Sequence, residues 1–288
     1  MVVGDAGFEP AASASRTRRA TELRQSPPTM RKNLRFFSSL VRQRRTLKGK
    51  LAALFPLSTV LILAKASTIK RMLGVLVCLV GIVAILGISE LLWRAKILHG
   101  ELQRKFVHIT GGTFAAGWPW LVSWQTIQLL GMALLAGVLL NRYKKFSHFK
   151  DGVKRESYGD IFSALAIILC ATLTNEPIFY ALAILHLALA DGLAAVIGTS
   201  YGRAWRYLVF RQTKTVIGSM TFWFVSVCIL GAAVLFTSEL ISFDSYAALL
   251  LVLPPVLTAL ENLSVLGLDN IVIPAAVLAG LETVQGVS

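Results

Sequence analysis

The chain is organised as apolar runs separated by short polar or basic stretches. Runs close to the roughly 20 residues that cross a bilayer recur from about residue 72 onwards. The runs 73–89 and 216–238 contain no charged residue, whereas a soluble protein of this length would show amphipathic helices with charge along one face. The pattern predicts an all-α, polytopic transmembrane helical bundle with about 7–9 membrane helices.

Eight of these runs are predicted to be membrane spans, at about 72–93, 106–122, 125–141, 160–174, 178–198, 216–238, 246–260 and 271–284. The run 51–64 is shorter and contains Pro56. It is compatible with an interfacial or re-entrant helix, or with a span completed by Lys65. Residues 51–288 are therefore expected to form one transmembrane domain.

Residues 1–50 are expected to be a basic, disordered extension of that domain. They hold 12 Lys/Arg against 3 Asp/Glu, and the first 30 residues show no helical periodicity. Residues 1–29 have the Arg- and Ser-rich character of a transit peptide. The preferred interpretation is that they are translated flanking sequence, with Met30 or Met72 as the initiator.

The net charge of +14 does not indicate a nucleic-acid partner. Most of the excess lies in residues 1–50, and the rest lies in loops beside apolar runs, where basic residues set membrane topology. The three cysteines, Cys78, Cys170 and Cys228, are isolated within apolar runs. Their spacing matches neither a metal site nor a disulfide framework, so they are interpreted as packing residues.

Basic residues fall in alternate loops. Loops 94–105, 142–159 and 199–215 each carry several Lys or Arg, whereas the loops near Ser123, at 175–177 and at 239–245 carry none. By the positive-inside rule the basic loops are cytoplasmic, as in a multi-pass protein of a bacterial inner membrane. The polar residues that a simple membrane anchor would not need lie at the ends of the spans beside these basic loops. They can therefore converge on one cytoplasmic site.

The segment Asp191–Ser219 carries the strongest candidate chemistry. Asp191 lies in an apolar run, where an ionisable residue is costly and by default marks a functional site. At helical spacing Asp191 shares one face with Ala194 or Ala195 and with Gly198, which leaves room for a cation or for phosphate with Mg²⁺. The structural alternative is a packing motif, because small residues let membrane helices approach closely.

The end of the same segment has the composition of an anion site. Lys214-Thr215 and Gly218-Ser219 stand where a loop becomes a helix, so an ammonium, a hydroxyl and backbone N–H groups come together. The GxxxxGK[ST] pattern of a P-loop does not occur. The alternative is that Lys214 is an ordinary lysine of a basic loop.

Further candidates lie at the mouths of other spans. Asp160 could instead be a helix cap, and His186, deep among Leu and Ala, is interpreted as a core residue. The remaining candidates are Arg104, Lys105, His108, Arg155, Glu156, Glu261, Asp269 and Asn270.

Five short motifs follow one another between roughly residues 100 and 275: RKFVH (104–108), RESYGD (155–160), DGLAAVIGTSYG (191–202), KTVIGS (214–219) and a terminal E…LDN…P ending at Pro274. In order and spacing they resemble the membrane-bound polyprenol kinase family, which includes dolichol kinases, phytol kinases and CTP-dependent diacylglycerol kinases. The set is distantly similar to phosphatidate cytidylyltransferases. Members similar to phytol kinases often carry a second acid where this chain has Ala195.

The resemblance implies phosphoryl transfer from CTP, or another nucleoside triphosphate, to the hydroxyl of a long-chain lipid alcohol such as phytol, polyprenol or dolichol, with Mg²⁺ or Mn²⁺. It implies catalytic roles for Asp191, Asp160 and Asp269, with Asp191 and Asp269 as metal ligands. Expected phosphate-binding residues are Lys214, Thr215, Gly218, Ser219, Arg155, Gly198, Gly202, Arg104 and Lys105, and further site candidates are His108, Glu156, Glu261 and Asn270. The competing interpretations are a cytidylyltransferase-like enzyme that makes a CDP-lipid and, from another class, a transporter or structural membrane protein.

Overall fold

The computed structural model describes residues 57–144, 158–210, 212–237 and 240–287. The extension 1–50 and the candidates Arg155 and Glu156 lie outside these residues. The chain divides into two compact units, Met1–Ser67 and Thr68–Ser288. Only the start of one helix is described in the first unit, so the fold below is that of the second.

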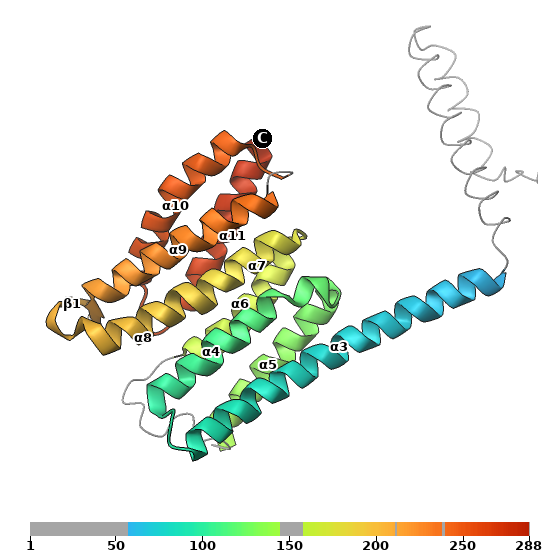
Figure 1. Ribbon diagram of the computed structural model, residues 1–288, viewed down its shortest axis with the longest axis horizontal. Helices are drawn as coiled ribbons and strands as arrows, with labels where there is room; N and C mark the ends of the chain where they lie inside the picture. Colours follow the sequence, from blue (N-terminus) through green and yellow to red (C-terminus); the bar gives the residue numbers. More distant parts are fainter. Residues whose placement is uncertain (1–56, 145–157, 211, 238–239, 288) are drawn as a thin grey trace, which may run out of the picture. The chain divides into compact units, whose positions relative to one another are not determined.

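The described residues are almost entirely helical (Figure 1), which confirms the predicted all-α class. Two short strands, β1 (Arg206–Val209) and β2 (Gln212–Thr215), form an antiparallel hairpin that the sequence analysis did not anticipate. The described residues also include three short helical turns. The 3₁₀ turn η1 (Trp118–Trp120) and the π-helical turn η3 (His186–Asp191) lie between longer helices, and the 3₁₀ turn η4 (Gly202–Ala204) leads into β1. The helices are α3 (Leu57–Arg94), α4 (Gly100–Ala116), α5 (Trp124–Lys144), α6 (Gly159–Leu173), α7 (Pro177–Leu185), α8 (Gly192–Tyr201), α9 (Val216–Thr237), α10 (Phe243–Leu263) and α11 (Asp269–Val287).

Five helical segments within the described residues are long and apolar enough to cross a membrane: Thr68–Arg94, Trp124–Tyr143, Pro177–Ala204, Val216–Thr237 and Phe243–Leu263. The shorter α6 is also apolar. Each of the eight predicted spans coincides with a helix, so the chain is a multi-pass membrane protein. The total of about 7–9 spans stays a prediction.

Two helices, α4 and α3, have bounds that differ from those expected. The predicted span 106–122 is replaced by α4, which begins at Gly100 and ends at Ala116. The helix begins early because long charged side chains are good helix formers. Arg104 and Lys105 therefore lie inside it. Its early end falls before Pro119, which has no backbone N–H to continue the helical hydrogen bonds. Residues 57–64 belong to α3 and continue without a break into the predicted span 72–93.

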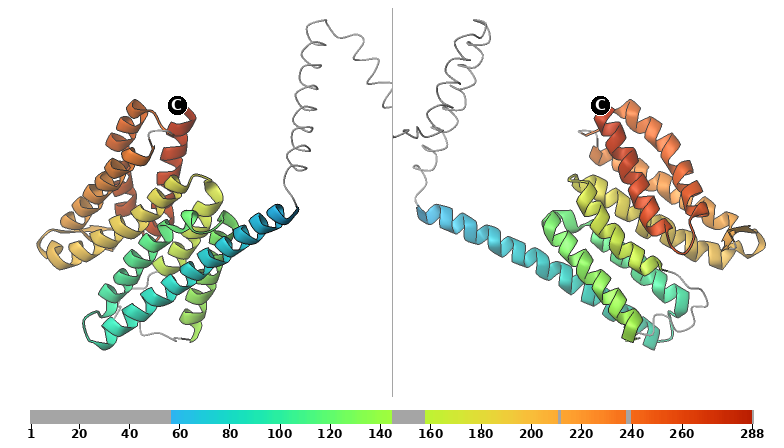
Figure 2. Two further views of the ribbon diagram at one scale, coloured as in Figure 1. Left: turned by 45° about the vertical axis from the view of Figure 1, so that its right-hand side comes forward. Right: turned by 180° about the vertical axis from the view of Figure 1, so that it is seen from behind.

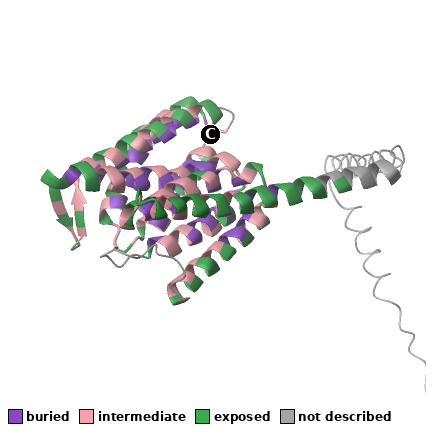
Figure 3. Cartoon of the chain, turned by 60° about the horizontal axis from the view of Figure 1, so that its bottom comes forward, coloured by how far each residue is buried: buried purple, intermediate pink, exposed green. Residues whose placement is uncertain are grey.

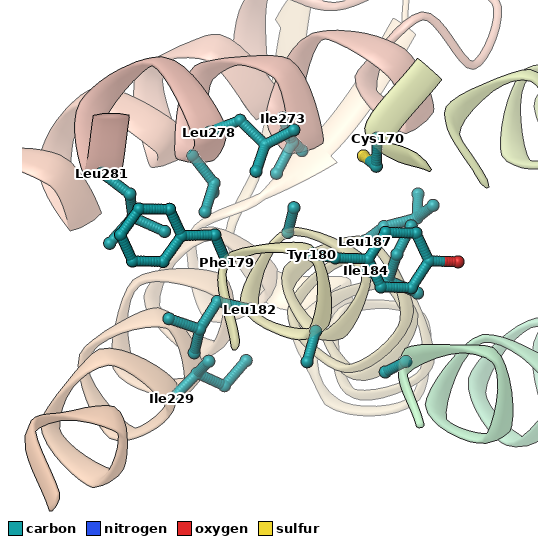
Figure 4. Packing of buried hydrophobic residues seen from close by; sticks show 14 of the residues in the cluster. Cys170, Phe179, Tyr180, Leu182, Ile184, Leu187, Ile229, Ile273, Leu278 and Leu281 are labelled. Carbon is teal, nitrogen blue, oxygen red and sulfur yellow. The ribbon is translucent and has the colours of Figure 1, made fainter. Parts of the chain in front are cut away.

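The segment from α7 through η3 to α8 is the central helix of the bundle. In its most apolar stretch 67% of residues are buried, against 17–33% in the other four membrane-crossing segments. It packs against α4, α6, α9 and α11. Figure 4 shows this core, in which Phe179 of the central helix lies beside Leu281 of α11, and Leu182 lies toward Ile229 of α9. Burial on all sides explains why this run is apolar all round.

Many large apolar side chains are exposed on the surface of the bundle. Exposed positions dominate the visible length of α3 (Figure 3), and they include Leu73, Leu76 and Val80. Exposed Leu and Val side chains in such number are expected on helices that contact lipid. Figure 2 shows the opposite side of the bundle, where α11 lies beside α10.

Candidate active site

A pocket of about 380 Å³ lies where one end of α4 meets the start of α8, strand β2, the start of α9, the end of α10 and the start of α11. These segments are distant in sequence but adjoin the basic loops, so the polar residues that end the spans do converge. The pocket gathers eleven of the predicted residues: Arg104, Lys105, Asp191, Gly198, Lys214, Thr215, Gly218, Ser219, Glu261, Asp269 and Asn270. Ala194 and Ala195 also line it, as the expected helical face requires.

Three carboxylates form the centre of this pocket. Asp191, Glu261 and Asp269 each offer an oxygen, and the three oxygens lie within 4.8 Å of one another. Asp191 and Glu261 are buried. Burial and the nearby charge of Asp191 raise the pKa of Asp269, which lies just outside the predicted span 271–284, to about 6. Such crowded carboxylates indicate a site that lacks positive charge, and oxygen ligands of this kind suit Mg²⁺ or Mn²⁺.

Asp191 is held by two side chains of α4. Lys105 Nζ donates to Asp191 Oδ2 at 2.7 Å, and the two side chains are 7% and 9% exposed. His108 Nε2 lies 3.3 Å from the same oxygen and 2.9 Å from the Leu187 carbonyl. Because a carbonyl can only accept, Nε2 carries the proton. The polar contacts of Asp191 within the described residues all use Oδ2, which leaves Oδ1 for another ligand.

Lys214 makes the second buried ion pair. Its Nζ donates to the Glu261 carboxylate and, at 2.9 Å, to the Glu261 backbone carbonyl near the C-terminal end of α10. The partial negative charge at that helix end favours the ammonium. Each of the two lysines in the pocket therefore neutralises one carboxylate of the cluster, and Asp269 is the third.

The net charge of the side chains that line the pocket indicates which ligands the pocket can accept. Four acidic and three basic side chains line it within the described residues: Glu101, Asp191, Glu261 and Asp269 against Arg104, Lys105 and Lys214. Arg104 is itself paired with Glu101 through Nε at 3.0 Å. A lining with one excess negative charge repels a polyphosphate, and a divalent cation reverses that sign. The donor set thus fits a metal ion together with a phosphate ligand.

Three glycines bring α8 and α9 close together at the pocket. The Thr215 hydroxyl accepts a hydrogen bond from Gly218 N at 3.1 Å and so caps the start of α9. A Cβ atom on Gly198 would lie 2.7 Å from Thr215 Oγ1, and one on Gly202 would lie 2.6 Å from Thr215 Cβ. These glycines are needed for close helix packing, and their contribution to phosphate binding stays a prediction.

Substitution of Gly198 by alanine is expected to destabilise the protein by about 1–3 kcal/mol, because the added methyl group displaces Thr215 from its capping position. Thermal unfolding in detergent, followed by intrinsic fluorescence, measures this effect. The matched control is Gly231→Ala in α9, where nothing lies within 4 Å of the added Cβ. That variant should be as stable as the parent or more so, since alanine is the better helix former. Equal stability of the two variants would contradict the packing role.

Two residues of the site were not found from the sequence, Tyr207 and Asn262. The hydroxyls of Tyr207 and Ser219 lie 2.6 Å apart, and both reach Asn262 Oδ1. Tyr207 pairs with Lys214 across the hairpin, and Asn262 follows Glu261 on α10. The hairpin is therefore fixed to α10 by two adjacent residues. Residues 206–209 include Tyr207 and Val209, residue types that favour strands, and this was the available signal.

The other predicted residues lie outside the lining of the pocket. Asp160 forms an ion pair with Arg142 across α5 and α6, with Nη2 and Oδ1 2.8 Å apart, and its catalytic role stays a prediction. His108 and Gly202 contact lining residues without lining the pocket themselves. His186 is fully buried, as expected of a core residue, and its Nδ1 contacts the Leu182 carbonyl at 2.7 Å. Its Nε2 has no hydrogen-bond partner among the described residues.

The cysteines are free in the described structure. Cys78 and Cys170 are buried, which agrees with a packing role. Cys228 is exposed on α9, so the packing interpretation does not hold for that residue.

Comparison with curated proteins provides the family. A phytol kinase from Synechocystis sp. is 32% identical to this chain over 198 residues, which cover 66% of the chain and 82% of the relative. The chain belongs to the polyprenol and phytol kinase family. The resemblance inferred from the five motifs is confirmed, and the family is one of lipid-alcohol kinases. No protein-family model and no solved structure matches this chain significantly.

Proposed function

We propose that this protein is a membrane kinase that transfers the γ-phosphoryl group of CTP to the hydroxyl of a long-chain isoprenoid alcohol, with Mg²⁺ or Mn²⁺ as cofactor. The observation that carries the proposal is the cluster of Asp191, Glu261 and Asp269 beside two lysines, in a pocket at the ends of apolar helices. Phosphoryl transfer requires charge neutralisation and positioning more than covalent chemistry, and this arrangement provides both.

The metal would be held by Asp191 and Asp269, with Glu261 as a third oxygen ligand. When bound, the cation supplies charge neutralisation at the phosphates of the nucleotide. Lys105 holds the Asp191 carboxylate in place at 2.7 Å, so its role is to orient the ligand and to limit repulsion within the cluster.

The phosphates would be bound by Lys214 and Arg104, whose side chains both line the pocket. The start of α9 beside Ser219 adds the partial positive charge of a helix N-terminus. In the reaction, the alcohol oxygen forms a bond to the γ-phosphorus, the bond from that phosphorus to CDP breaks, and CDP leaves. The hydroxyl proton passes to a carboxylate of the pocket.

The acceptor alcohol would reach the pocket from the lipid side of the bundle. The similarity to a protein named phytol kinase makes phytol the first candidate for the acceptor. Polyprenol and dolichol are the other candidates. Ala195 lines the pocket where similar members carry an acid, so the acceptor has to be tested rather than assumed. The basic loops beside the pocket support a cytoplasmic location, where nucleotides are available.

The test is to incubate purified protein in vesicles with CTP labelled at the γ-phosphate and with phytol, a polyprenol, dolichol or diacylglycerol, and in a separate reaction with phosphatidate, the acceptor that a cytidylyltransferase needs. Label in the lipid fraction supports the kinase, and its loss with EDTA and return with Mg²⁺ support the metal site. Label in pyrophosphate with none in lipid would replace the kinase by a cytidylyltransferase. ATP and UTP in parallel reactions decide the donor.

Replacement of Tyr207 by phenylalanine is expected to raise the KM for the nucleotide about 3- to 10-fold and to change kcat little, because one hydrogen bond that holds the hairpin and Lys214 is lost. Initial rates at varied nucleotide concentration measure both constants. Tyr201→Phe is the matched control, since Tyr201 is 74% exposed in the same loop region. A decrease in kcat at unchanged KM would argue against this positioning role.

A further inference from the structure

The β1–β2 hairpin has two chemically different faces. Its inner face carries Tyr207 and Lys214, which pair across the strands and bind Asn262 and Glu261 of α10. Its outer face and tip carry large apolar side chains that pack on little of the protein: Leu208 is 75% exposed and Phe210 is 69% exposed. The inner face is explained by the pocket, and the outer face is not.

Phe210 occupies a backbone position that does not suit it. Val209 and Gln212 are paired at the end of the hairpin, and Phe210, in the turn that follows Val209, has a φ of 45°. Two-residue hairpin turns require such positive φ values and favour glycine or asparagine, because a β-carbon is strained there. A phenylalanine at this place neither helps the turn nor fills a core. An observed strain of this kind points to a role for the side chain itself.

The hairpin is adjacent to the apolar layer of the membrane. One membrane-crossing segment ends at Ala204, and the next begins at Val216, directly after β2. Each strand has four residues and spans about 13 Å, so the tip stays near the bilayer surface. The exposed apolar surface continues onto the first turns of α9, where Met220 is 64% exposed and Phe224 is 61% exposed. Figure 1 shows the hairpin at the shared end of α8 and α9.

Charge and aromatic composition identify the partner surface. Trp205, 68% exposed, stands just before β1, and tryptophan is favoured at the membrane–water interface. Arg203 and Arg206 are also exposed beside it. Apolar side chains flanked by arginines fit an anionic lipid surface, because the apolar groups enter the interface and the guanidinium groups meet the headgroups.

We propose that Leu208 and Phe210, on the outer face and tip of the hairpin, and Trp205, just before β1, insert into the interfacial region of an anionic bilayer, with Arg203 and Arg206 at the headgroups. The opposite face of the same two strands holds Lys214 in the pocket. Lipid contact therefore restrains the element that positions Lys214. This inference does not depend on which reaction the pocket carries out.

The direct test places the photoreactive residue benzoylphenylalanine at position 210 of the full-length protein in vesicles of phosphatidylcholine with or without phosphatidylglycerol. The control places it at position 212, where Gln212 lines the pocket on the inner face. Mass spectrometry is expected to find several-fold more lipid adduct at 210 than at 212, with a further increase when phosphatidylglycerol is present. Equal adduct at the two positions, or adduct to protein alone at 210, would overturn the proposal whether or not the protein is a kinase.

A second variant separates membrane contact from turn stability. Phe210→Gly relieves the positive φ, so its thermal stability in detergent should equal or exceed that of the parent. In anionic vesicles the same variant is expected to have a several-fold higher KM for the nucleotide, and in detergent an unchanged one. An unchanged KM in both environments would show that Phe210 does not couple lipid contact to the pocket.

Discussion

Replacement of Asp191 by asparagine is expected to lower kcat by at least about 10²–10³-fold, as measured by transfer of labelled γ-phosphate to lipid. The amide keeps the size of the side chain but removes the charge that would hold the metal ion. Asp191 is the centre of the carboxylate cluster, and its oxygen lies within 4.8 Å of those of Glu261 and Asp269. The control is Asp244→Asn, because Asp244 is an exposed carboxylate at the start of α10, away from the pocket.

A loss of activity in this variant could also arise from unfolding, because it leaves the buried Lys105 without its partner. Removal of one member of a buried ion pair costs about 3–5 kcal/mol, whereas replacement of both members is often neutral. The double variant Lys105→Met with Asp191→Asn should therefore recover much of the lost thermal stability in detergent and none of the activity. Recovery of activity in the double variant would mean that Asp191 serves only to neutralise Lys105.

Replacement of Lys214 by methionine is expected to raise the KM for the nucleotide by about 10- to 100-fold, the effect of one lost charge-assisted hydrogen bond to phosphate. Methionine retains the length and apolar stem of the side chain and lacks the ammonium group. Lys214 is the expected phosphate ligand, and its Nζ is held beside the carboxylate cluster by its ion pair with Glu261. Initial rates at varied nucleotide concentration in vesicles measure the change.

Two further variants test that interpretation. Lys70→Met removes an exposed lysine of α3 and should leave both kinetic constants unchanged. Lys214→Met combined with Glu261→Gln removes both charges of the buried pair and should recover thermal stability without lowering the KM. A KM that matches the parent in Lys214→Met would exclude Lys214 as a phosphate ligand.

Much of the fold could be predicted because membrane insertion depends on a local property. Each apolar run gains free energy from its own transfer into lipid, so the runs could be identified one at a time. The boundaries were less certain where polar residues begin a helix. In α4 the charged residues Arg104 and Lys105 are helical, although they read as a loop in a pattern of apolar runs. The hairpin of β1 and β2 was missed because its strands are only four residues long.

The sequence by itself determined the all-α membrane class, the family motifs and the presence of Asp191, Lys214, Glu261 and Asp269 at the ends of spans. Only the tertiary structure decided which charges meet. Lys105 and Asp191 are 86 residues apart in sequence, Lys214 and Glu261 are 47 apart, and Tyr207 and Asn262 are 55 apart. Such pairings depend on how α4, α8, α10 and the hairpin pack together, and packing is a property of whole helices rather than of the residues beside each charge.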